Sequence, residues 1–423
     1  MYLVLRTETF TKLFFLISCT GLFLYAVLAF YTFHTAYTSL GAQYSDSQDL
    51  RSMDFDVYGE IDKDLKYILV WTQSNDQKSS PEGQQIFTDH RCEFSNCFLT
   101  TNKKMLRGDY KNFDAIIFDI SVVKDWKKIN LPQSRSMRQK YIFYSMESSD
   151  DSPVCNVNVD NYFNWTWTYK LNSDIVSPFI EVTDLQGNVV APKLNVNWTN
   201  NLNILEDKEI DAMKPKRKAA AMILEKCNIK YNKATLIKSL QTEFKMNLLE
   251  FDVYGCGNLN CSIHGCLKDI EKKYYFYLVH EDSFAEDYVT KEVIKAYHHD
   301  AVPIVHGGAD YHRFLPDGSY IQVKTNSLDQ LVAKVDYIIR NPYLYYSYFS
   351  WKKFYSIHET EEFRGICELC AYLNDEKKFG SYSVYKEFRK WWYPGSLYDR
   401  CIPRGAEELA EVLSYINSTV HLI

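Results

Sequence analysis

A group of polar side chains follows the apolar run YYFYLV (274–279) and could bind a charged ligand. These side chains are His280, Glu281, Asp282, Tyr288, Lys291 and Glu292. Apolar residues recur every four positions from Val289 to Tyr297, as in the buried stripe of a helix. Lys291 and Glu292 then lie near its N-terminus, where a lysine favours a diphosphate ligand. A capped helix with a solvated charge pair fits the pattern equally well.

Short apolar runs on either side of a polar region predict the elements that position these side chains. The first set comprises 66–71, 113–120 and 140–147, and the second comprises 219–224, 247–255, 274–279 and 301–307. Both sets are rich in β-branched and aromatic residues, as buried parallel strands are, and helical patterns alternate with the second set. We therefore predict two doubly wound α/β domains, which bind ligands at the carboxyl ends of their strands.

The N-terminal residues predict a membrane anchor. Residues 1–12 are expected to form a cytoplasmic tail, 13–33 a transmembrane signal anchor and 34–64 a stem, because 13–33 are apolar and long enough to cross a bilayer. Arg6 and Lys12 precede this segment, which favours a cytosolic N-terminus and a lumenal chain. A cleaved signal peptide is the alternative. The two domains are predicted over 65–210 and 211–423.

Sequons and cysteines agree with passage through the secretory pathway. The candidate N-glycosylation sites are Asn164, Asn197, Asn260 and Asn417. Of the eleven cysteines all but Cys19 follow the anchor, and their even number suits disulfides in an oxidising lumen. Zinc binding by Cys256, Cys261 and Cys266, or by the Cys367 and Cys370 pair, is an alternative without matching histidine spacing. The net charge is -6, and basic and acidic residues are interspersed, so the charge pattern does not indicate a surface that binds nucleic acid.

Several segments of the chain together match the pattern of one protein family. The segment FYLVHEDSFAEDYVTKEVIKAYHHDAVPIVHGG resembles the signature FYL-x-FENS followed by DY[VI]TEK of the α-1,3-fucosyltransferases of glycosyltransferase family 10, in particular insect or other invertebrate members. MESSDDSP, YFNWTWTYKLNSDIVSPF, DVYGCG and ICELCAYL also resemble family segments, in the expected order, over most of residues 66–375.

The resemblance implies a fold, a reaction and site residues. The fold would be GT-B, with two facing Rossmann-like domains, in a single-pass type II protein of the Golgi membrane. L-Fucose would pass from GDP-β-L-fucose to the 3-hydroxyl of N-acetylglucosamine in a glycoprotein or glycolipid glycan. One general base suffices because the reaction inverts the anomeric centre, and the matching position is Glu147, at the end of the run KYIFYSME.

The same resemblance assigns the remaining roles. The residues expected to bind the donor are Lys233, Glu281, Asp282, Tyr288, Lys291 and Glu292. The disulfide candidates are Cys92, Cys97, Cys367 and Cys370. No obligatory metal is expected, and a divalent metal would at most stimulate the reaction. The Asp-x-Asp pairs at 54–56 and 62–64 lie before the first strand, where a metal motif of the other glycosyltransferase fold would not be placed. A homodimer remains open.

Three departures from the family pattern fall on the donor side. HEDS replaces FENS, so that Asp282 places a carboxylate near the diphosphate. TKE replaces TEK, which moves the cation around the helix axis. Glu225, Lys226 and Cys227 replace S-N-C, and Lys233 replaces a later arginine, which loses bidentate geometry. The alternative function is therefore a catalytically impaired family member that binds glycans or protein partners in the lumen.

Overall fold

The computed structural model describes residues 64–71, 82–124, 131–199, 216–227, 231–361, 364–395 and 401. The predicted cytoplasmic tail, anchor and almost all of the stem lie outside these ranges, as does the sequon at Asn417. Within the described ranges, no helix has the length and apolar character needed to cross a membrane.

The first sheet is six-stranded and parallel, in the order β2-β1-β3-β4-β5-β6. Its strands are β1 (Lys66–Trp71), β2 (Cys97–Thr100), β3 (Ala115–Asp119), β4 (Lys140–Ser145), β5 (Trp165–Thr168) and β6 (Ile175–Val176). Between them lie the helices α2 (Gln85–Asp89) and α3 (Ile120–Lys124) and the 3-10 turns η2 (Leu106–Gly108), η3 (Tyr110–Asn112) and η5 (Val157–Val159). The predicted run at 66–71 is β1, and the run at 140–147 ends as a strand at Ser145, two residues before Glu147.

The second sheet is five-stranded and parallel, in the order β10-β9-β11-β12-β13. Its strands are β9 (Lys218–Ile223), β10 (Phe251–Tyr254), β11 (Tyr274–His280), β12 (Val302–His306) and β13 (Ile321–Gln322). Its helices and turns are α5 (Tyr231–Met246), α6 (Cys266–Lys273), α7 (Glu292–His298), η6 (Tyr311–Arg313), α8 (Leu328–Arg340), α9 (Pro342–Ser347) and η7 (Ser350–Lys353).

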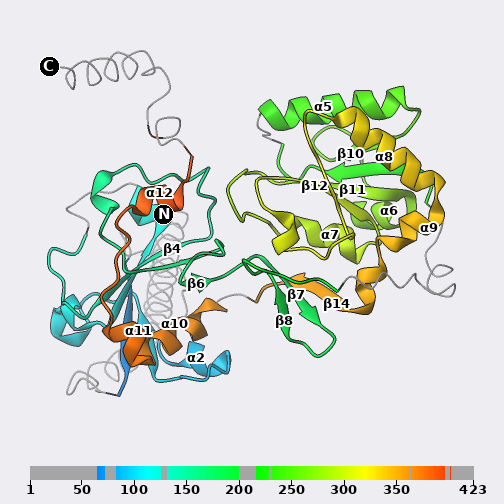
Figure 1. Cartoon of the computed structure of the whole chain (residues 1–423). Helices are drawn as coiled ribbons and strands as arrows, with labels where there is room; N and C mark the ends of the chain where they lie inside the picture. Colours follow the sequence, from blue (N-terminus) through cyan, green and yellow to red (C-terminus); the bar gives the residue numbers. More distant parts are fainter. Residues whose placement is uncertain are drawn as a thin grey trace, which may run out of the picture. The chain divides into compact units, whose positions relative to one another are not determined.

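Helices cover both faces of the second sheet (Figure 1). Phe276 and Leu278 pack in one core cluster with side chains of α5 and α8, whereas Tyr277 and Val279 pack in another with side chains of α6 and α7. This alternation follows from the two-residue repeat of a strand. An α/β fold with parallel, Rossmann-like sheets is therefore confirmed.

A small antiparallel sheet joins segments that are distant in sequence. It has the order β14-β7-β8 and consists of β7 (Ile180–Asp184), β8 (Val189–Ala191) and β14 (Tyr355–Glu359). After β14 the chain forms α10 (Gly365–Asn374), α11 (Glu376–Gly380) and α12 (Phe388–Trp392).

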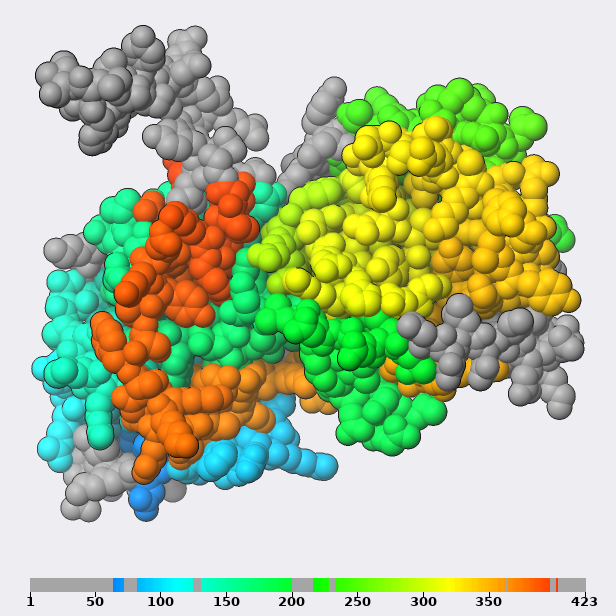
Figure 2. Space-filling model, in the orientation of Figure 1, coloured from blue at the N-terminus to red at the C-terminus, as the bar shows by residue number. Residues whose placement is uncertain are grey.

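These last helices pack on the first sheet. Ile366 and Leu369 of α10 lie in one core cluster with Ile68 of β1 and Ile117 of β3. On β4, the ring of Phe143 contacts Phe388 and Trp392 of α12, at 4.8 and 4.9 Å between centroids. Figure 2 shows this segment in orange and red against the blue and cyan of the first sheet's region. The stretch predicted as one second domain, 211–423, thus contributes buried side chains of α10 and α12 to the packing of the first sheet.

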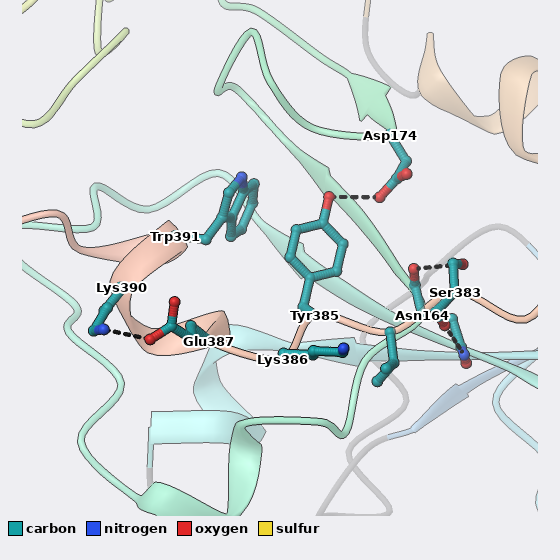
Figure 3. A pocket seen from close by; sticks show the side chains of 9 residues that line it. Asn164, Asp174, Ser383, Tyr385, Lys386, Glu387, Lys390 and Trp391 are labelled. Carbon is teal, nitrogen blue, oxygen red and sulfur yellow. Dashed lines mark hydrogen bonds and ion pairs between the residues drawn. The ribbon is translucent and has the colours of Figure 1, made fainter.

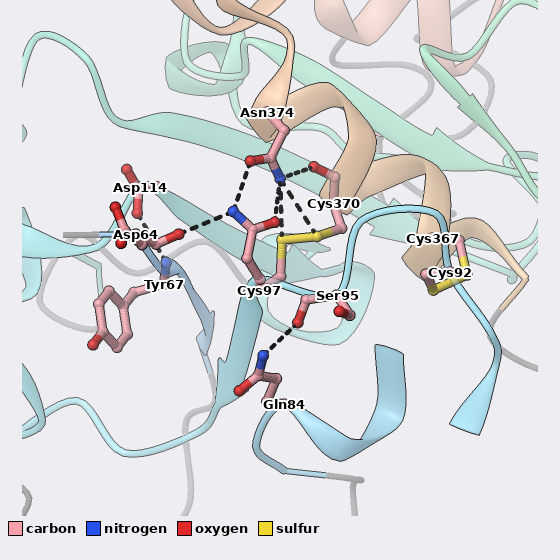
Figure 4. Close-up of a disulfide and its surroundings, with 11 residues drawn as sticks. Asp64, Tyr67, Gln84, Cys92, Ser95, Cys97, Asp114, Cys367, Cys370 and Asn374 are labelled. Atoms are coloured by element: carbon pink, nitrogen blue, oxygen red, sulfur yellow. Dashed lines mark hydrogen bonds between the residues drawn. A yellow bond between two sulfur atoms is a disulfide. The ribbon is translucent and has the colours of Figure 1, made fainter. Parts of the chain in front are cut away.

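All ten cysteines after residue 33 are paired in disulfides. The pairs are Cys92–Cys367, Cys97–Cys370, Cys155–Cys401, Cys227–Cys256 and Cys261–Cys266. The first two tie α10 to the first sheet's region, and Asn374 donates to the sulfurs of Cys97 and Cys370 (Figure 4). The four disulfide candidates are confirmed, and the zinc alternative is wrong because those thiols are oxidised.

Candidate active site

Glu281 lies immediately after β11 and is buried. Only 1% of the residue is exposed, and its carboxylate accepts hydrogen bonds from the Thr290 backbone N–H at 3.0 Å and hydroxyl at 2.7 Å. Burial raises the pKa of Glu281 to about 7, although the bonds from Thr290 act in the other direction. Gly307 borders this carboxyl, since a Cβ there would come within 2.9 Å of Glu281 Cγ.

Asp282 forms ion pairs with two lysines, so it is not an isolated negative charge. Lys233 of α5 lies 2.9 Å from its carboxylate and Lys226 lies 3.7 Å away. Burial acts to raise the pKa of Asp282, but the hydrogen bond from Lys233 and the charges of both lysines outweigh it and lower the pKa. The carboxylate is therefore ionised at neutral pH, and the group of three has one positive charge in excess.

The exchanged Lys291 and Glu292 have separate environments. Lys291 precedes α7 and forms an exposed ion pair with Glu359 of β14 at 2.7 Å. Glu292, at the start of α7, accepts a hydrogen bond from Tyr277 at 2.6 Å and pairs with Lys295 at 2.6 Å. Lys295, which also pairs with Glu225, supplies the compensating cation one turn further along the helix. The two exchanged residues thus have different ion-pair partners, Glu359 for Lys291 and Lys295 for Glu292.

Glu147 follows β4 and its side chain is half exposed. The Ser152 hydroxyl donates to its carboxylate, and Lys124 of α3 lies 3.7 Å from the same oxygen. The Ser145 hydroxyl bonds to both the backbone N–H and carbonyl of Glu147, which fixes the turn after the strand. The carboxylate is therefore oriented but accessible.

Direct contacts join the segment after Glu147 to the segment after Glu281. The Ser148 and Ser283 hydroxyls are hydrogen-bonded to each other, and both side chains are buried. The Ser149 N–H donates to the hydroxyl of Tyr169 at 2.9 Å, and the ring of Tyr169 meets that of Tyr288 edge to face at 5.1 Å. The structure therefore brings the predicted base and the donor-binding segment into one region.

A buried cation that sequence reasoning missed lies at the same junction. The side chain of Lys170 is 0% exposed, and its ammonium pairs with Glu286 at 3.0 Å. Next to it, the N–H of Leu171 donates to Asp287 at 3.0 Å. The only sequence signal was the position of Lys170 just past the run YFNWTWTY, but strand patterns do not reveal which lysine will be buried.

A histidine is the last residue of each of the neighbouring strands β11 and β12. His280 and His306 are paired in the parallel register, with ring centroids 4.8 Å apart, and both contact the ring of Phe284. Burial lowers the pKa of each imidazole to about 4, with the charge of Lys233 adding to the effect at His280. Both rings are therefore neutral at neutral pH. Among the described residues, no three His, Cys, Asp or Glu side chains gather as a metal site.

The described sequons differ in access. Asn197 and Asn260 are exposed. Asn164 is buried, with its amide oxygen accepting from the Tyr141 N–H at 2.8 Å and its amide nitrogen donating to the Ser383 carbonyl at 2.6 Å. A glycan at Asn164 would displace the hydrogen bond from its amide nitrogen to Ser383, and glycosylation at this position stays a prediction.

Two parallel sheets with acidic and basic side chains after their strands place this chain in the doubly wound α/β class, whose members bind ligands at that edge of the sheet. Two family models match this chain, namely "Fucosyltransferase, N-terminal" over residues 63–180 and "Glycosyltransferase family 10 (fucosyltransferase) C-term" over residues 213–391. The chain belongs to glycosyltransferase family 10, the fucosyltransferases. The resemblance drawn from its motifs is confirmed.

Individual relatives agree with this assignment. Alpha-(1,3)-fucosyltransferase C of Drosophila melanogaster is 29% identical over 316 residues, which are 73% of this chain and 72% of the relative. Glycoprotein 3-alpha-L-fucosyltransferase A of the same species is 27% identical over 323 residues, or 74% and 57% of the two chains. A crystal structure of an alpha1,3-fucosyltransferase with GDP-fucose superimposes with a TM-score of 0.45 at 14% identity, covering 76% of this chain and 92% of that one.

Proposed function

We propose that the chain transfers L-fucose from GDP-β-L-fucose to the 3-hydroxyl of an N-acetylglucosamine in a glycan, with inversion. The observation that carries this proposal is the hydrogen bond between Ser148 and Ser283, which joins the segment of the base to the segment of the donor site. Membership of family 10 supports the transfer of fucose.

Glu147 is the general base in this reaction. Its carboxylate takes the proton of the acceptor hydroxyl while the hydroxyl oxygen attacks the anomeric carbon of fucose. The bond from that carbon to the diphosphate breaks, and GDP leaves with the electron pair. The Ser152 hydroxyl orients the carboxylate, and the ammonium of Lys124 lies 3.7 Å from it.

Lys233 and Lys226 carry the positive charge that faces the leaving diphosphate. Since Asp282 neutralises only one of them, a net charge of +1 remains for the ligand. Glu281 and Tyr288 match the family pattern directly, and we assign them to the fucosyl-nucleotide, with Glu281 fixed in place by Thr290. Lys291 and Glu292 act less directly, through their ion pairs with Glu359 and Lys295.

The impaired, glycan-binding alternative is less well supported. It rested on unbalanced charges in the donor region, but each introduced carboxylate has a lysine partner. Asp282 has Lys233 and Lys226, while Glu225 and Glu292 share Lys295. The departures from the family pattern thus come with compensating partners, and active transfer is favoured.

The cellular setting is part of the proposal. We infer a single-pass type II protein of the Golgi membrane with a lumenal catalytic part and a GT-B arrangement of two facing domains. The apolar segment at 13–33 and the five disulfides support it, because such bonds persist in oxidising compartments. GDP-fucose and a glycan on a glycoprotein or glycolipid are the partners, with no obligatory metal.

The test uses the full-length chain purified in detergent, with binding of GDP-fucose measured by calorimetry and GDP release measured with an N-glycan acceptor. We expect saturable binding and acceptor-dependent release. Lys233→Ala should weaken binding at least tenfold, whereas Lys334→Ala on α8 should not. Absence of donor binding by the unmodified chain, or GDP release that ignores the acceptor, would overturn the proposal.

A further inference from the structure

A hollow of about 600 Å³ lies on the first sheet's region, beside α12, and no role in the reaction has been given to it (Figure 3). It is lined by Asn164, Asp174, Ser383, Val384, Tyr385, Lys386, Glu387, Lys390 and Trp391. Its volume lies in the range of small-molecule sites. Most of its lining comes from residues 383–391, the segment that returns to the first sheet after the second sheet is complete.

The floor of the hollow is rigid. Asp174 accepts hydrogen bonds from the Thr166 N–H at 2.8 Å and from the Tyr385 hydroxyl at 2.9 Å. The buried amide of Asn164 holds the Ser383 carbonyl at 2.6 Å. Tyr385 and Trp391 meet with ring centroids 5.1 Å apart, at 63°. A ligand would therefore meet preformed aromatic surfaces.

The rim of the hollow offers polar groups whose charges balance. Glu387 and Lys390 pair with each other, while Lys386 is exposed and has no bonded partner among the described residues. Asp174 offsets the remaining charge. The indole N–H of Trp391 is buried and has no hydrogen-bond acceptor within the described part of the chain. Aromatic faces, donors, acceptors and zero net charge suit a neutral ligand rich in hydroxyl groups.

The hollow adjoins the segment of the base. Trp392, next to Trp391, donates its indole N–H to the Ser152 carbonyl at 2.9 Å, and the Ser152 hydroxyl binds Glu147. The ammonium of Lys170 lies 5.6 Å from the ring centre of Trp391. Trp391 in the lining of the hollow is thus linked to Glu147 through its neighbour Trp392 and through Ser152.

We propose that this hollow is a subsite for a neutral sugar of the acceptor glycan beyond the N-acetylglucosamine that receives fucose. The inference rests on the proposed function. Tyr385 and Trp391 provide the stacking surface, and Lys386 and Glu387 bind hydroxyl groups at the rim. The enzyme then distinguishes extended glycans from short acceptors by their KM.

Steady-state kinetics with two acceptors test the subsite. The extended acceptor is an N-glycan on a glycopeptide, and the short one is the methyl glycoside of N-acetylglucosamine. For Trp391→Ala we expect KM for the glycopeptide to rise roughly three- to tenfold, as loss of an aromatic contact would cause, with kcat and the KM of the short acceptor unchanged. Tyr382→Ala, an aromatic control that is 85% exposed outside the hollow, should change neither.

Trp391 also packs against Phe388, so Trp391→Ala could affect folding as well as binding. A second variant therefore tests the subsite without changing this packing. The double substitution Lys386→Ala with Glu387→Gln alters only exposed side chains and should raise the same KM. Equal effects on both acceptors, or none on the glycopeptide, would overturn the subsite.

Saturation-transfer NMR with the glycopeptide alone separates this inference from the proposed function. Contacts to the outer sugars that vanish in Trp391→Ala support the subsite even if the unmodified chain transfers no fucose. Transfer by the unmodified chain without such contacts would refute the subsite and leave the proposed reaction intact. Absence of both contacts and transfer would overturn both.

Discussion

Glu147 carries the proton transfer in the proposed reaction, held by the hydroxyl of Ser152 and the ammonium of Lys124. In Glu147→Gln the side chain keeps its shape and loses the proton acceptor, so kcat should fall by roughly 10²- to 10⁴-fold. The Kd for GDP-fucose should stay within about twofold, because the donor lysines are unchanged. Rate assays and calorimetry on the same preparations measure both.

Glu376→Gln on α11 is the control, since it removes an exposed carboxylate from the same region. If Glu147→Gln kept more than a tenth of the wild-type kcat, another group would have to be the base.

Glu281 should make the stability of the protein depend on pH. Its folded-state pKa is raised to about 7, above its ordinary value of 4.5, so the folded chain retains a proton that the unfolded chain releases between these values. The contribution of Glu281 to the free energy of unfolding is therefore fully present below about pH 4.5, and it is lost as the pH rises to about 7. The loss is up to about 3 kcal/mol in the free energy of unfolding.

Denaturant unfolding of wild type and Glu281→Gln at pH 5 and pH 8 measures this effect. Other groups contribute equally to both proteins, so the difference between them isolates Glu281. The variant should be the less pH-dependent of the two, and Glu361→Gln, at an exposed site, should behave as wild type. Identical pH slopes for wild type and Glu281→Gln would contradict the buried-carboxyl argument.

At the scale of elements, the contact between the segments after β4 and β11 depends on two buried hydroxyls, those of Ser148 and Ser283. Ser283→Ala leaves the Ser148 hydroxyl without this partner, and we expect the free energy of unfolding to drop by about 1 to 2 kcal/mol. Activity should fall more than donor affinity, because the base and donor segments lose their alignment.

Ser356→Ala is the matched control for this prediction, since that serine is exposed on β14. Stability comes from denaturant titration, activity from GDP release and affinity from calorimetry. A Ser283→Ala protein with wild-type kcat would show that the contact does not align the two segments.

The sequence located most elements because their signals are local. The apolar run at 66–71 is β1, and the four-residue repeat from Val289 to Tyr297 is buried as expected. The stripe therefore placed Lys291 and Glu292 correctly at the start of α7. It could not show that Lys291 turns to Glu359, since that partner comes from β14, far along the chain.

At the scale of the whole molecule, two disulfides close most of the described chain into a loop. Cys97 and Cys370 are separated by 273 residues, whereas Cys261 and Cys266 are separated by 5. A long loop loses more entropy on closure, so removal of both long-range disulfides, with Cys92, Cys97, Cys367 and Cys370 all changed to Ala, should lower the free energy of unfolding by roughly 2 to 5 kcal/mol. Cys261→Ala with Cys266→Ala is the matched control and should cost less.

Chemical denaturation of the variant without the two long-range disulfides and of the variant without Cys261–Cys266, under non-reducing conditions, makes the comparison. A larger loss from removing the Cys261–Cys266 pair would mean that the attachment of α10 to the first sheet does not depend on its disulfides.

The sequence alone determined the α/β class, the family and the position of most strands, because alternating apolar runs and ordered motifs are properties of the linear chain. Tertiary structure decided which charges meet. It joined Lys226 and Lys233 to Asp282, buried Lys170 beside Glu286, and placed the amide of Asn164 in hydrogen bonds inside the chain. It also returned residues 365–392 to the first sheet, where 383–391 supply most of the lining of the hollow. The physical reason is that ion pairs, buried side chains and concave surfaces form between segments that are far apart in the sequence. A local sequence pattern does not show which distant segments come into contact in the folded chain.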